Sequence, residues 1–137
     1  MIAITATKGD WMLFIAQILM LIVALLHCLF FKLESLDFMK PKVLKSFGLD
    51  TSSGEIAKIW AFNQGFYNLF LAFGLFFTLY LFQVERIIEA QILAYFILWT
   101  IVGAGAVLLF SSRKSRLAAM IQGLPALLGI VCLYLSF

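Results

Sequence analysis

Four long stretches without a charged side chain restrict what this sequence can fold into. They cover residues 11–31, 59–82, 92–110 and 117–137. A hydrocarbon layer of about 30 Å needs about 20 helical residues to cross it, and each stretch is close to that length. Transmembrane strands would need alternating polar and apolar residues, which the run FILWTIVGAGAVLLF does not show. We therefore predict an all-α fold, a four-helix transmembrane bundle with up-down topology.

The composition supports a membrane protein with a single membrane domain over residues 1–137. Only 12% of the residues are charged and 64% are hydrophobic, whereas soluble domains carry about 25% charged residues. So little charge does not cover the surface of a soluble domain. We expect the helices at the ranges that follow: about 11–31, 53–82, 87–110 and 117–136, with a short interfacial helix at about 41–47.

The distribution of basic residues predicts an orientation. The loop at 32–58 and the connection at 113–116 hold eight of the ten lysines and arginines, and only Lys8 and Arg86 lie on the other side. The positive-inside rule then places the first and third loops in the cytoplasm and both termini on the non-cytoplasmic side. The excess of basic over acidic residues therefore indicates topology and contact with anionic lipid headgroups, and no nucleic-acid partner is expected.

The first loop contains two local signals. PKVLKSFG begins with Pro41 and ends with Gly48, residues that suit the start and the end of a helix. We interpret it as an amphipathic helix lying on the inner leaflet, and a basic loop with a chance apolar face is the alternative. Ser52 and Glu55 then have the spacing of a capping box, which predicts that the second long helix begins near Ser53.

A cluster of polar side chains interrupts the second apolar stretch. NQGFYN places four hydrogen-bonding side chains within six residues. The up-down connectivity brings them to the same half of the membrane as the polar residues of helices one and four. An amide facing lipid at that depth costs several kcal/mol, so we expect this stripe to face the bundle interior. The candidate ligand-binding residues are His27, Glu34, Asn63, Gln64, Tyr67, Asn68 and Gln122.

The sequence gives no sign of a cofactor or a metal. It has one histidine, two separate cysteines and no cluster of carboxylates, whereas a zinc site needs several such ligands and bis-histidine haem binding needs a second histidine. We therefore expect no cofactor.

Several interpretations of the polar cluster stay open. Buried amides often only hold helices together. If the cluster is a site, the first hypothesis is a pocket for a small amphipathic or lipid-like molecule. The alternatives are a structural subunit of a larger membrane complex or homo-oligomer, and an enzyme in which His27 and Glu34, two turns apart, carry out acid–base chemistry. A small multidrug-type transporter is the least favoured, because helix one has no deep carboxylate.

Four motifs together are similar to a known family. LLHCLFFKLES, KSFGL, NQGFYNLFLAFG and QGLPALLG occur in this order, and the chain resembles the small membrane family called domain of unknown function 1304. The resemblance extends from about residue 14 to residue 133, and the helix-two motif is the specific one. It implies four helices and a bacterial inner membrane, and it implies no function. The motif positions in this chain are His27, Glu34, Phe47, Gly48, Leu49, Asn63, Gln64, Gly65, Tyr67, Asn68, Gln122, Pro125 and Ala126.

Overall fold

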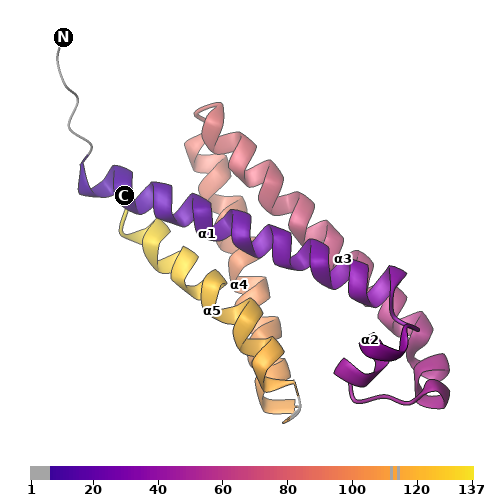
Figure 1. The fold of residues 1–137 in the computed structure, drawn as a ribbon. Coiled ribbons are helices and arrows are strands. Elements are labelled where there is room, and N and C mark those ends of the chain that lie inside the picture. The colour runs from indigo at the N-terminus through magenta and orange to yellow at the C-terminus, as the bar shows by residue number, and fades with distance from the viewer. Residues whose placement is uncertain (1–6, 112, 114) are drawn as a thin grey trace.

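The computed structural model describes residues 7–111, 113 and 115–137, and every regular element within these ranges is helical. Four helices are long and apolar enough to cross a membrane. A π-helical turn, η1, extends the first of them, and a short helix precedes the second (Figure 1). The elements are α1 (Lys8–Phe31), η1 (Lys32–Leu36), α2 (Pro41–Ser46), α3 (Thr51–Gln83), α4 (Ile87–Ser111) and α5 (Arg116–Tyr134).

The helix ends follow from local capping. Thr7 and Asp10 form a reciprocal capping box at the start of α1. At the start of α3, the Asp50 side chain accepts a 2.7 Å hydrogen bond from the backbone N–H of Ser53. The predicted capping box of Ser52 and Glu55 is therefore wrong, because Asp50 already caps α3 two residues earlier.

The core lies where the four long helices meet. Met20, Leu75, Leu98 and Leu133, one from each long helix, are fully buried. The most extensive contacts join α1 to α3 and α4 to α5, while α1 also packs on α5 and α3 on α4. A single apolar cluster thus joins all four helices.

Small residues allow α4 and α5 to approach closely. A Cβ atom added at Gly105 would lie 3.4 Å from the Cα of Gly123 and 3.2 Å from the carbonyl oxygen of Ala119. The two backbones approach this closely because small residues face each other at the contact. At Gly103, by contrast, an added Cβ would meet nothing within 4 Å.

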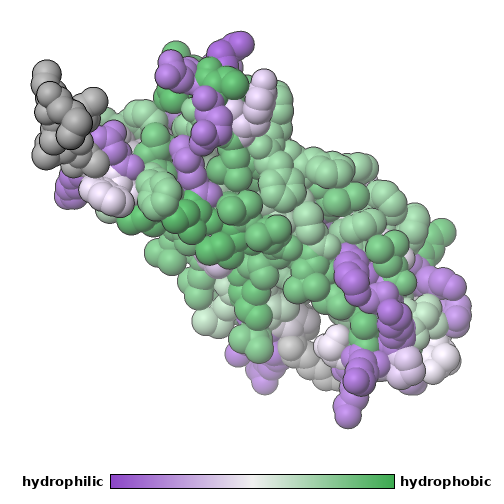
Figure 2. Space-filling model, turned by 45° about the horizontal axis from the view of Figure 1, so that its top comes forward, coloured by the Kyte–Doolittle hydropathy of each residue, from purple (hydrophilic) through white to green (hydrophobic). Residues whose placement is uncertain are grey.

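The two helix pairs diverge toward one end of the molecule. We call this the basic end; it holds residues 32–58 and the connection between α4 and α5. Figure 1 shows α4 and α5 moving away from α3 and α2 there. At the other end the start of α1 lies beside the residues that follow α5, since an added Cβ at Gly9 would lie 3.0 Å from the carbonyl oxygen of Ser136. Figure 2 shows hydrophilic residues gathered at both ends and a broad apolar belt between them.

The segment after α1 folds back onto α3. In η1 the backbone N–H of Asp37 donates to the carbonyl of Lys32, a π-helical bond of 2.9 Å. The apolar face of α2 is buried, and a Cβ added at Gly54 of α3 would lie 2.5 Å from the Leu44 side chain. This differs from the expectation that the α2 face lies on the leaflet, because α3 extends beyond its apolar stretch and covers that face.

Candidate functional site

The first element of the site is a hydrogen bond between two helical segments. Nδ2 of Asn68 on α3 donates to Oε2 of Glu34 in η1 over 2.7 Å. Asn68 is 6% exposed, so burial keeps water from competing strongly for its amide. This bond satisfies the deepest amide of NQGFYN within the protein itself.

A close contact beside this bond fixes η1 against α3. A Cβ added at Gly65 would lie 2.1 Å from Oγ of Ser35 and 3.1 Å from its backbone nitrogen. The Ser35 hydroxyl donates a 2.8 Å hydrogen bond to the carbonyl of Phe62. Only glycine leaves room for this approach. Gly65 therefore sets the distance at which Glu34 meets α3.

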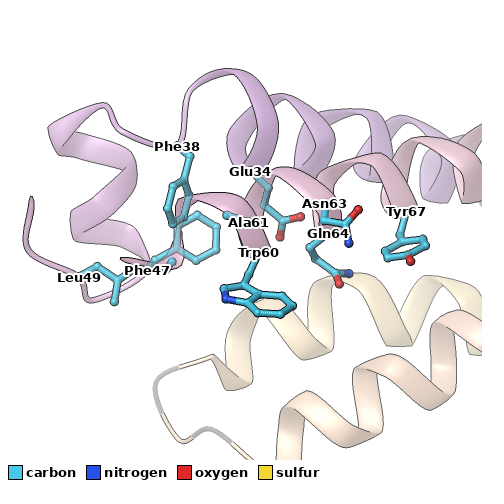
Figure 3. A pocket seen from close by; sticks show the side chains of 10 residues that line it. Glu34, Phe38, Phe47, Leu49, Trp60, Ala61, Asn63, Gln64 and Tyr67 are labelled. Carbon is cyan, nitrogen blue, oxygen red and sulfur yellow. The ribbon is translucent and has the colours of Figure 1, made fainter. Parts of the chain in front are cut away.

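Next to the Glu34–Asn68 bond the surface is hollowed. We call this space the hollow; its volume is about 510 Å³, within the range of about 300–1,000 Å³ typical of ligand pockets. Figure 3 shows the Glu34 carboxylate pointing toward Asn63 and Gln64, with aromatic rings on both sides. The hollow is lined by Glu34, Phe38, Phe47, Leu49, Ala57, Trp60, Ala61, Asn63, Gln64 and Tyr67.

The hollow lies on the face of α3 that α4 covers farther along. At Gly74 an added Cβ would lie 2.5 Å from the Ile97 side chain of α4. Tyr67 and Trp60 precede Gly74 by seven and fourteen residues, so all three share one helix face. The exposed fractions of Tyr67 and Trp60 are 57% and 74%. The divergence of α4 from α3 therefore leaves this face uncovered at the basic end.

This uncovered face corrects one expectation. Asn63, Gln64 and Tyr67 were expected in the bundle interior, but all three are exposed and line the hollow. Only Asn68 is turned into the packed interface with α1 and η1. The physical reason is that the helix expected to cover the other three has separated from α3 at this depth.

His27 and Gln122 do not join this group. His27 is 1% exposed, and its Nδ1 donates a 2.8 Å hydrogen bond to the carbonyl of Val23 in its own helix. Its ring also packs edge-on against Phe30, with 5.6 Å between ring centroids. Gln122 is half-buried on α5, which packs on α4 and α1. Neither residue is among those that line the hollow, so five of the seven predicted site residues meet around Glu34 and these two do not.

A cluster of charged side chains holds together the loop between η1 and α2, at the rim of the hollow. The Asp37 carboxylate forms ion pairs with Lys32 and, at 2.8 Å, with Lys40. Hydrogen bonds from these two ammonium groups lower the pKa of Asp37 below its ordinary value. The cluster ties the end of η1 to the start of α2, and the adjacent Phe38 packs against Phe47 with 5.7 Å between ring centroids.

Sequence reasoning missed the loop side of the hollow. Phe38 lies in a stretch with no recognisable motif, and the sequence places Phe47 and Leu49 only in a motif and at the end of a helix. Leu49 follows Gly48, whose φ of 71° turns the chain toward α3. Gly48 predicts a turn at this point, and this turn was the one signal in the sequence that the loop folds back onto α3.

Comparisons with known proteins identify the family to which the chain belongs. Searches of curated proteins and of solved structures found no match to the chain. A family model described as protein of unknown function (DUF1304) matches residues 21–134. The match spans α3 and α4 completely and includes Glu34, Asn68 and every residue that lines the hollow. The chain therefore belongs to the DUF1304 family of proteins of unknown function.

Proposed function

We propose that this protein binds a small amphipathic or lipid-like molecule in the hollow at its basic end. In this proposal it is a multi-pass protein of the bacterial inner membrane, with both basic loops in the cytoplasm. The eight-to-two distribution of basic residues supports this orientation. The ligand would then enter from the cytoplasmic half of the membrane.

The observation that carries the proposal is the mixed lining of the hollow. A carboxylate, two amides and a phenol share one space with Trp60, Phe38 and Phe47. Polar side chains at membrane depth are costly unless a partner satisfies them. Asn68 has its partner in Glu34, whereas Asn63 and Gln64 are exposed on the face that α4 leaves uncovered. A molecule with an apolar body and a polar end complements such a lining.

Site-specific photocrosslinking tests the proposal. Tyr67 is replaced by the photoreactive benzoylphenylalanine, and Phe96, an exposed aromatic residue of α4, is replaced in a matched control. After illumination of native membranes, mass spectrometry of the intact protein should show one dominant small-molecule adduct at position 67. The control should give only a mixture of bulk-lipid adducts. The same mixture at both positions would contradict the proposal.

The alternative function is that of a subunit in a larger membrane complex or homo-oligomer. The uncovered α3 face favours it, because the same face already receives a helix at Gly74. In this case the crosslinker at position 67 would yield a protein–protein adduct instead of a small-molecule adduct. The mass of that adduct would distinguish a second copy of the chain from another subunit.

A further inference from the structure

We infer that the hollow selects amphiphiles whose polar end is an alkylammonium group, with Glu34 as the counter-ion. This inference rests on the proposed binding function and adds the chemical class of the ligand. The cation would be a protonated amine or a quaternary ammonium group, carried either on a free amphiphile or on a lipid headgroup.

The charges around the hollow favour a cation. Among the described residues that line it, Glu34 is the one charged side chain, and none is a lysine or arginine. Of the five lysines at 32–58, Lys32 and Lys40 are paired with Asp37, and the other three do not line the hollow. A phosphate or carboxylate headgroup would therefore face Glu34 with no lining cation to compensate, which is unfavourable at low dielectric.

The position of Glu34 is fixed before any ligand arrives. The hydrogen bond from Asn68 engages one carboxyl oxygen, and the Ser35 contact with α3 holds the backbone. Figure 3 shows the carboxylate directed into the hollow from η1. An ionised carboxylate in apolar surroundings costs free energy unless an opposite charge faces it. A ligand cation would supply that charge.

Aromatic rings complete the environment that an alkylammonium group prefers. Trp60 and Tyr67 approach from α3, while Phe38 and Phe47 approach from the loop. A cation near aromatic faces gains about 0.5–2 kcal/mol, and aromatic surfaces together with a carboxylate are a recurrent way to bind ammonium ligands. The carbonyl oxygens of Asn63 and Gln64 can accept hydrogen bonds from a primary amine.

Fluorescence of Trp60 tests the inference. The chain has three tryptophans, so Trp11→Phe with Trp99→Phe leaves Trp60 as the reporter. The full-length protein in a neutral maltoside detergent is titrated with dodecylamine, dodecanol and dodecanoate, which share one tail length. Dodecylamine should change the emission saturably, with an apparent Kd at least tenfold lower than that of the alcohol or the acid.

Two variants check the counter-ion. Glu34→Gln keeps an acceptor for Asn68 but removes the charge. It should raise the apparent Kd of dodecylamine at least tenfold and leave the apparent Kd of dodecanol unchanged. Gln64→Lys changes an exposed residue and places a cation in the hollow. This variant should raise the apparent Kd of dodecylamine by a similar factor, and it keeps the test decisive if Glu34→Gln does not fold.

A second pair of probes distinguishes the source of the ammonium group. Dilauroyl phosphatidylethanolamine is compared with dilauroyl phosphatidylglycerol. Selective saturation by the ethanolamine lipid assigns the site to a headgroup, and saturation by dodecylamine alone assigns it to a free amphiphile. Equal binding of dodecylamine and dodecanol, unaffected by either variant, would overturn the ammonium inference while the crosslink at position 67 still supports binding. The absence of a crosslinked small molecule would instead overturn the proposed function.

Discussion

The Asn68 amide on α3 is bonded to the Glu34 carboxylate in η1, and these residues are 34 positions apart in the chain. The bond connects the end of the first membrane helix to the middle of the second. It also orients the only charged side chain among the described residues that line the hollow. The same contact thus contributes to stability and sets the electrostatics of the candidate site.

We predict that Asn68→Ala destabilises the protein by about 1–2 kcal/mol, the range for a hydrogen bond to a carboxyl group between membrane helices. A double-mutant cycle with Glu34→Ala should show that the two losses are not additive. Unfolding in a denaturing detergent measures the effect. Thr100→Val is the control, because this exposed hydroxyl bonds only to its own helix and its loss should cost little. Additive losses would contradict the coupling.

The contact of Gly65 with Ser35 gives a second prediction. Gly65→Ala should destabilise by about 1–3 kcal/mol, because the added methyl group displaces the Ser35 hydroxyl and presses on its backbone. Gly103→Ala is the matched control: it adds the same group to a helical glycine with open space around it. That control should be neutral or stabilise by up to about 1 kcal/mol. Thermal unfolding of both variants checks this, and equal losses would refute the close-contact explanation.

The ion pairs of Asp37 predict a pH dependence. The pKa of Asp37 is lowered from its ordinary value of 3.8 by Lys32 and Lys40. A carboxyl group with a lower pKa in the folded state stabilises the fold above the unfolded pKa, and this contribution is lost as the pH falls through the folded pKa. Thermal stability of the unmodified protein should therefore exceed that of Asp37→Asn at pH 6, and the difference should shrink below about pH 4.

A variant of the partner lysine checks the cause of this pH dependence. Lys40→Met removes one of the two ion pairs. In a Lys40→Met protein, the loss of thermal stability caused by Asp37→Asn at pH 6 should therefore be smaller. An Asp37→Asn protein whose stability matches the unmodified protein at every pH would show that the cluster does not hold the loop.

The proposed orientation predicts which cysteines react from outside the cell. In a chain with Cys28→Ala and Cys132→Ala, a single Ser136→Cys should react with a membrane-impermeant maleimide on intact cells. Lys45→Cys should react only after the inner membrane is permeabilised. Labelling is read by the mass shift of the purified protein, and the reverse pattern would contradict the orientation.

The four long helices could be predicted from the sequence because their stretches are uncharged and long enough to cross lipid. The family resemblance is also confirmed, by the match over residues 21–134. The extension of the first helix by η1 was not predictable, since a π-helical turn has no distinct residue pattern. The hollow depends on this turn, because η1 carries Glu34 to Asn68 and Ser35 to Gly65.

The sequence by itself determined that the apolar stretches become helices, because a backbone inside a membrane must satisfy its hydrogen bonds within each segment. It also determined that NQGFYN places polar groups at membrane depth. Only the tertiary structure decided which of them are paired. Asn68 meets Glu34, while the divergence of α4 exposes Asn63, Gln64 and Tyr67. The crossing of helices sets these contacts, and in a membrane protein the surfaces that face lipid and those that face another helix are similarly apolar.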